Sequence, residues 1–134
     1  MEGSAYVLGV EGLDRLIGGI EPPYVILVSG PPGSGKTTLA STICHRNALS
    51  GRRCLYAAFY EDREKLFRYM GRLGIDMAGA ESGGLLRFVR LPVASKAEAF
   101  VDHLSIALSE GDYKVVVVDP VNPILEAVSL ESTR

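Results

Sequence analysis

The chain has 134 residues, of which 47% are apolar and 22% are charged, so it is long enough for one domain with a substantial core and is not intrinsically disordered. The formal net charge of −2 excludes a global basic field for nucleic acid or an anionic membrane. The apolar runs have strand length rather than transmembrane length, and no signal peptide is recognisable, so the sequence predicts a cytoplasmic protein.

The first predicted strand is followed by a turn and a helix. Residues 24–28 form a continuous apolar run rich in β-branched side chains, which is typical of a strand buried on both faces. A turn rich in glycine and proline occupies residues 30–35. A helical pattern begins at Lys36, and its spacing puts Leu39, Ile43 and the stem of Arg46 on one side of the helix.

The chain has two cysteines. Cys44 precedes the second predicted strand, residues 54–60, and Cys54 is the first residue of that strand. Their spacing matches no zinc-site pattern, and free thiols in the core are the preferred interpretation, with a disulfide as the alternative. A second helix is predicted at residues 62–73. The stretch 76–84 is rich in glycine and small residues, and we interpret it as a surface loop.

The remaining elements continue the alternation of strand and helix. A third strand is predicted at residues 85–89. Ser95 and Glu98 have capping-box spacing, which predicts the start of a third helix. Residues 114–119 have the strongest strand pattern in the chain. Strands that alternate with helices in this way predict an α/β fold with a mainly parallel sheet and flanking helices.

Residues 30–37 match the phosphate-binding pattern G-x-x-x-x-G-K-[ST] and lie between a buried strand and a helix, as that pattern requires. Glycines let the backbone N–H groups turn inward toward phosphate oxygens, and the positive end of the helix favours an anion. The sequence therefore predicts a nucleoside triphosphate site; the alternative is a turn followed by a surface lysine. The predicted binding residues are Gly30, Pro31, Pro32, Gly33, Ser34, Gly35, Lys36, Thr37 and Thr38.

Three of these residues have distinct predicted roles. Lys36 is expected to reach the β- and γ-phosphates as a catalytic charge, and the Thr37 hydroxyl to ligate Mg²⁺. Thr38 is placed to donate a hydrogen bond to the α-phosphate.

Carboxylates follow two of the predicted strands. Asp119 ends the valine-rich strand, as the Walker B acid does, and is predicted to hold the magnesium shell; the alternative is a plain strand-ending Asp. Glu61 and Asp62 follow the second strand. We favour Glu61 as the base that activates water and Asp62 as the cap of the next helix or an auxiliary to that base. The alternative is that Asp62 caps the helix while Glu61 is solvated.

Several segments together resemble the KaiC-like branch of the RecA superfamily of ATPases, over most of the chain from about Val10 to Asp119. They are Gly12-Leu13-Asp14, Gly18-Gly19-Ile20, the stretch from Val25 to Thr38, Leu55-Tyr56, Glu61-Asp62-Arg63-Glu64, the helix with Leu66, Leu73-Gly74-Ile75-Asp76, and Asp119.

The resemblance implies a RecA-like ATP-binding core that often assembles as a ring with nucleotide at subunit boundaries. It also implies that Glu61 matches the first residue of a paired acidic motif. ATP rather than GTP, and a homo-oligomer rather than a monomer, are expected mainly from the resemblance. Nucleic acid is not an expected partner, because DNA-binding loops of RecA-like proteins would follow the Walker B strand.

The sequence departs from the family pattern at three points. The acidic pair is Glu61-Asp62 instead of two glutamates, and Pro120 replaces a hydroxyl residue after Asp119. The chain ends shortly after Asp119, so residues 1–134 are interpreted as a single incomplete domain that lacks the C-terminal part of the core. The strand that normally separates the P-loop and Walker B strands would be missing. Three arrangements are then open: the two strands pair directly, another chain inserts a strand between them, or the sequence is a fragment of a longer protein.

The leading functional prediction is an ATP-binding domain with slow Mg²⁺-dependent hydrolysis. The alternative from another class is a nucleotide-responsive signalling or assembly module without turnover. A small-molecule kinase is a third interpretation, which the two dozen residues before the first strand and the lack of a recognisable lid disfavour.

Overall fold

A computed structural model describes residues 24–27, 35–92, 97–120 and 123. Strands and helices alternate through the described part of the chain. None of the helices in that part has the length and apolar character needed to cross a membrane. The elements are β1 (Tyr24–Leu27), α2 (Lys36–Leu49), β2 (Cys54–Ala58), α3 (Arg63–Arg72), α4 (Met77–Ser82), β3 (Leu86–Arg90), α5 (Ala97–Ser109) and β4 (Val115–Asp119).

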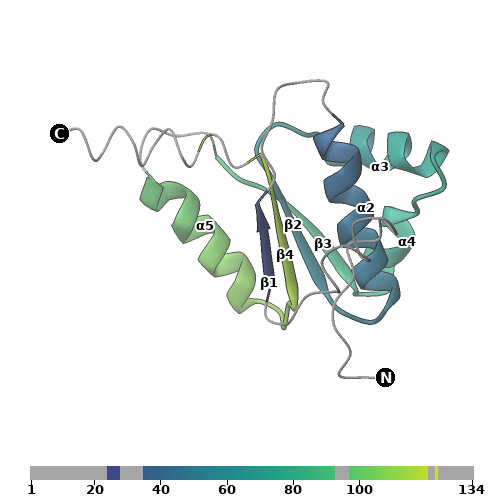
Figure 1. The fold of residues 1–134 in the computed structure, drawn as a ribbon. Helices are drawn as coiled ribbons and strands as arrows, with labels where there is room; N and C mark the ends of the chain where they lie inside the picture. The colour runs from purple at the N-terminus through teal and green to yellow at the C-terminus, as the bar shows by residue number, and fades with distance from the viewer. Residues whose placement is uncertain (1–23, 28–34, 93–96, 121–122, 124–134) are drawn as a thin grey trace, which may run out of the picture.

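The four strands form one parallel sheet in the order β1-β4-β2-β3 (Figure 1). The strand that carries Asp119 therefore pairs directly with the strand that precedes the P-loop, which is one of the three arrangements considered from the sequence. Leu27 of β1 lies opposite Val118, and Ala58 of β2 lies opposite Asp119. The predicted α/β class with a parallel sheet is confirmed.

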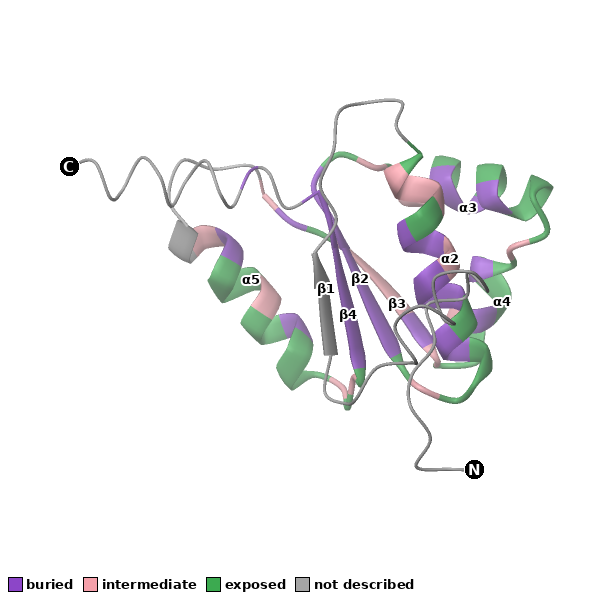
Figure 2. Cartoon of the chain, in the orientation of Figure 1, coloured by how far each residue is buried: buried purple, intermediate pink, exposed green. Residues whose placement is uncertain are grey.

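Helices cover both faces of the sheet. Helices α2, α3 and α4 lie on one face and α5 lies on the other (Figure 1). Side chains of β2 and β4 alternate between the two resulting cores, and every residue of both strands is buried (Figure 2). The core under α2 contains Tyr56, Ala58, Val115 and Val117, and the core under α5 contains Leu55, Ala57, Val116 and Val118.

The prediction of a loop at residues 76–84 is wrong, because α4 forms there. Asp76 caps the helix, with its Oδ1 accepting a hydrogen bond from the Gly79 N–H at 3.0 Å. Met77 and Ala80 are buried in the core under α2. Two apolar contacts and a cap thus stabilise a helix in a segment whose glycines suggested a loop.

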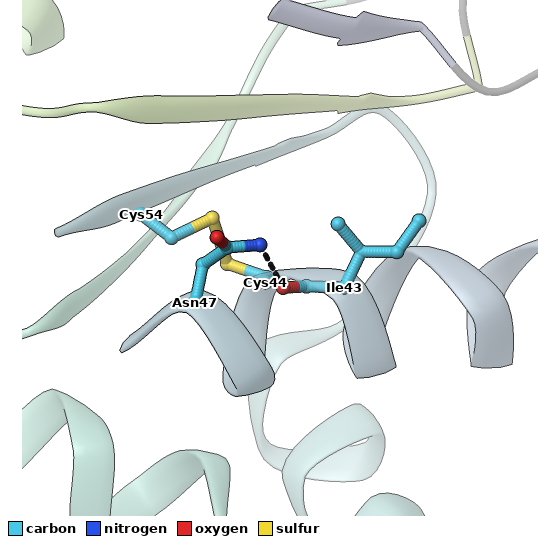
Figure 3. The surroundings of a disulfide bond; sticks show 4 residues. All are labelled: Ile43, Cys44, Asn47 and Cys54. Carbon is cyan, nitrogen blue, oxygen red and sulfur yellow. Dashed lines mark hydrogen bonds between the residues drawn. A yellow bond between two sulfur atoms is a disulfide. The ribbon is translucent and has the colours of Figure 1, made fainter. Parts of the chain in front are cut away.

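The cysteines form a disulfide between α2 and the first residue of β2 (Figure 3). Cys44 and Cys54 are fully buried, as predicted, and their Cα atoms lie 5.5 Å apart. The preferred expectation of free thiols is therefore wrong. Each cysteine faces the same core from a different element, and the two are only ten positions apart in the sequence. Beside them, the Asn47 side-chain amide donates to the Ile43 carbonyl at 2.9 Å (Figure 3).

Asp62 is the N-cap of α3. Its Oδ2 accepts a hydrogen bond from the Lys65 N–H at 3.0 Å, and its own backbone is extended. This confirms the capping role that the sequence predicted for Asp62. On the helix that it opens, Leu66, Phe67 and Met70 are buried.

We expect Phe100→Ala to lower the free energy of unfolding by about 3–5 kcal/mol, because a large buried side chain is lost and a cavity remains. Phe100 is 0% exposed and contacts Phe59 edge-to-face, with ring centroids 5.1 Å apart. Urea unfolding followed by circular dichroism measures the loss. Ile106→Ala on the same helix is the control, because Ile106 is 59% exposed. Equal losses in both variants would contradict the placement of α5.

Asp62→Ala should lower the free energy of unfolding by about 0.5–2 kcal/mol, because the first turn of α3 loses its side-chain acceptor. Asp62→Asn keeps a side-chain oxygen at the N-cap and should stay close to the unsubstituted protein. The same urea titration compares the two variants. A stability loss in Asp62→Asn as large as in Asp62→Ala would show that charge, rather than the cap, is what matters at this position.

Candidate functional site

The carboxyl ends of all four strands meet at one edge of the sheet because every pairing is parallel. Strand β1 ends at Leu27, β2 at Ala58 and β4 at Asp119, and α2 begins after the predicted P-loop. Ligands of open α/β sheets bind at this edge. The predicted phosphate-binding residues Gly30, Pro31, Pro32, Gly33 and Ser34 lie outside the described residues.

The described end of the P-loop forms the start of α2. Gly35 is the N-cap with φ 83°, a left-handed conformation that glycine adopts without strain. Lys36, Thr37 and Thr38 form the first turn and are half-buried. The N–H groups of a helix's first turn lack acceptors within their own helix, and the positive end of a helix favours an anion.

Asp119 is a buried carboxylate at the same edge. It is 1% exposed, and the alternation along β4 turns it to the α2 face, as it does Val115 and Val117. Its Oδ2 accepts a hydrogen bond of 2.5 Å from the Tyr56 hydroxyl. Its Oδ1 is buried without a hydrogen-bond partner among the described residues. A buried carboxylate oxygen without a partner is costly unless a ligand completes it.

Tyr56 is kept protonated by its surroundings. Burial, and next the charge of Asp119 and the hydrogen bond to it, raise the pKa of Tyr56 well above its ordinary value. The Ser41 hydroxyl lies near the phenol and has the opposite, smaller effect on its pKa, although it forms no hydrogen bond of ordinary geometry. Tyr56 is therefore a hydrogen-bond donor to Asp119 at any physiological pH.

Helix α2 links this buried group to the phosphate end of the site. Ser41 lies four residues after Thr37, so the two side chains share one side of the helix, one turn apart. Ser41 is fully buried near Tyr56, and Thr37 lies one turn nearer the start of the helix. Thr37 in the first turn of α2 and Asp119 at the end of β4 are the two residues predicted to hold magnesium.

These residues fit Mg²⁺ better than a metal held wholly by protein. No group of three or more His, Cys, Asp or Glu side chains in the described part of the chain could hold a metal ion. Mg²⁺ commonly takes one or two protein oxygens and completes its shell with water and phosphate oxygens. The unpartnered Oδ1 of Asp119 is an oxygen of the chemical type that such a site uses.

Glu61 also lies near the edge, in the segment between β2 and α3. It is half-buried, and its charge is among the causes that raise the pKa of Tyr56, so it lies within electrostatic range of that phenol. Its neighbour Asp62 already accepts the capping hydrogen bond of α3. Of the two carboxylates, Glu61 is the one without a structural role in the described hydrogen bonds.

The contact of Tyr56 with Asp119 was missed from the sequence, where Tyr56 was placed only within the second predicted strand. The period of two along β2 puts Tyr56 and Ala58 on one face, a signal visible in the sequence. The register of β2 against β4, which makes Tyr56 a diagonal neighbour of Asp119, is not visible there.

Comparison with known proteins agrees with this geometry. The family described as "ATPase: KaiC" matches residues 7–134. The circadian clock protein KaiC3 of Synechocystis sp. is 34% identical over 128 residues, which cover 94% of this chain and 25% of that protein. The circadian clock oscillator protein KaiC of Thermostichus vulcanus is 35% identical over 131 residues, with the same coverage.

A shorter match reaches a protein of another name. The DNA repair protein RadA of Mycobacterium tuberculosis is 43% identical over 67 residues, which cover 49% of this chain and 14% of that protein. The chain spans about a quarter of the length of the KaiC relatives. The family model matches nearly the whole chain, the sheet is parallel, and the P-loop pattern precedes α2. The chain therefore belongs to the KaiC ATPase family and is an ATP-binding P-loop domain of the RecA superfamily.

Proposed function

We propose that this chain binds MgATP at the carboxyl edge of its sheet and hydrolyses ATP slowly. The observation that carries the proposal is Asp119, whose Oδ1 is buried at the end of β4 without a hydrogen-bond partner among the described residues. A buried, half-satisfied carboxylate at the end of a parallel strand is the group that a P-loop site needs beneath its metal ion.

Each residue of the site has a proposed role. Residues 30–38 would hold the phosphates, with Lys36 as the charge on the β- and γ-phosphates. Thr37 and Asp119 would hold Mg²⁺, which when bound neutralises charge on the phosphate oxygens. Glu61 would orient and deprotonate the attacking water, a role supported by its position at this edge and by the engagement of Asp62 in capping.

Assembly and location are proposals of the same kind. We propose a homo-oligomer, supported by the family to which the chain belongs, and a cytoplasmic location, supported by the sequence. Hydrolysis by a single copy would be slow, since a cationic group supplied by a neighbouring subunit typically contributes about 10³–10⁵ in rate.

Calorimetric titration of MgATP into the chain tests the binding site. Micromolar binding is expected, and Lys36→Ala should weaken it about 10- to 100-fold, because charge-assisted hydrogen bonds to phosphate are lost. Lys65→Ala, which changes an exposed lysine on α3, is the control and should bind as the unsubstituted chain does. Equal affinities in all three proteins would exclude the P-loop as the nucleotide site.

Glu61→Gln should lower the rate of ATP hydrolysis about 10²- to 10⁴-fold, because an amide cannot accept the proton of water, while MgATP affinity stays unchanged. Phosphate release under saturating MgATP measures the rate. Asp62→Asn is the matched control, since it removes a neighbouring charge and keeps the cap of α3. Binding without turnover in the unsubstituted chain would favour the alternative, a nucleotide-responsive module.

A further inference from the structure

We propose that Tyr56 is a positioning residue for the metal site: its hydroxyl holds Oδ2 of Asp119, so that Oδ1 alone is presented to the Mg²⁺ shell. This inference rests on the proposed function and adds a residue to it that the P-loop and Walker B patterns do not contain. Tyr56 does not contact the nucleotide or the metal in this proposal; it acts through Asp119.

The register of the sheet makes the contact. Ala58 lies directly opposite Asp119 in the β2–β4 ladder, so Tyr56, two residues earlier, is the diagonal neighbour on the same face. The small side chain of Ala58 leaves the path open for the phenol to reach forward along the strand. The hydroxyl oxygen then lies 2.5 Å from Oδ2 of Asp119, a short distance typical of a hydroxyl donating to a carboxylate.

The phenol is held in place from its other side. Tyr56 is 0% exposed, and its ring stacks on Phe88 of β3 with centroids 5.6 Å apart and planes 17° apart. Phe67 of α3 meets the same Phe88 ring edge-on, with centroids 6.0 Å apart. A ring packed in this way fixes the direction of its hydroxyl, and therefore the rotation of the Asp119 carboxylate.

The division of the two carboxylate oxygens follows from this contact. Among the described residues, Tyr56 supplies the hydrogen bond to Oδ2, and Oδ1 has none. Without the hydroxyl, both oxygens would be buried and unsatisfied, and the carboxylate could turn either oxygen toward the metal. The hydroxyl thus selects one orientation before Mg²⁺ binds, which lowers the cost of organising the site.

The test compares Tyr56→Phe with the unsubstituted 134-residue chain by titrating Mg²⁺ at a fixed ATP concentration. The half-saturating Mg²⁺ concentration should rise about tenfold in the variant, equivalent to about 1.4 kcal/mol. ATP affinity measured in EDTA should change less than about twofold, because the P-loop contacts remain, so that only the metal-dependent part of binding moves. Tyr60→Phe is the matched control, since it removes a hydroxyl from a residue that is 57% exposed near the same edge.

The outcomes separate this inference from the proposed function. An unchanged Mg²⁺ dependence in a folded Tyr56→Phe chain overturns the role of Tyr56 and leaves the nucleotide site intact. An equal change in Tyr60→Phe also overturns it. An unsubstituted chain that binds no ATP, with or without Mg²⁺, overturns the proposed function and the metal role of Tyr56 together.

A second test uses the unsubstituted chain, so that the proposal can still be tested where Tyr56→Phe folds poorly. A buried hydroxyl donating to a carboxylate should give a slowly exchanging proton signal in NMR spectra. Adding Mg²⁺ to the ATP-bound chain should shift that signal, because the metal withdraws electron density from the acceptor, Asp119. A signal that Mg²⁺ leaves unmoved overturns the proposal.

Discussion

The pairing of β4 on both of its edges is the constraint on which the rest of the structure depends. Four valines pair with β1 on one side, the same valines and Asp119 pair with β2 on the other, and all five residues are buried. A strand in this position has no polar backbone group left to water, so its register is strongly fixed. That register sets Leu27 and Asp119, the ends of β1 and β4, at one edge of the sheet.

The same burial removes Asp119 from water, at a cost in free energy that a bound ligand can offset. A carboxylate among valines loses its hydration, and the loss is offset only where hydrogen bonds or a cation replace the water. Tyr56 satisfies one oxygen of Asp119, and the other remains without a partner in the described part of the chain. A site that is incomplete without its ligand is less stable than a fully satisfied core, and proteins tolerate that deficit mainly where they bind something.

The sequence predicted the elements well and the contacts between them poorly. Hydrophobic runs located all four strands, because central parallel strands must be apolar on both faces, and Asp62 was recognisable as a cap from its place before a helix. Strand order was not predictable, since the direct pairing of β1 with β4 depends on long-range contacts that leave no local pattern. For the same reason the partner of Asp119 was missed, although Tyr56 was correctly placed in a strand.

The burial pattern of α2 determines how closely the helix packs against the sheet. An amphipathic pattern predicts that large apolar residues face the core, yet Leu39 is 37% exposed while Ala40, Cys44 and Ala48 are fully buried. These three residues recur every fourth position, so the helix turns a row of small side chains toward β2 and β4. Small side chains let a helix lie close to a sheet. Leucine in that row would hold α2 farther from β4. The small row therefore sets how close α2 lies to the strand that ends in Asp119, and with it the position of the first turn of the helix relative to the sheet.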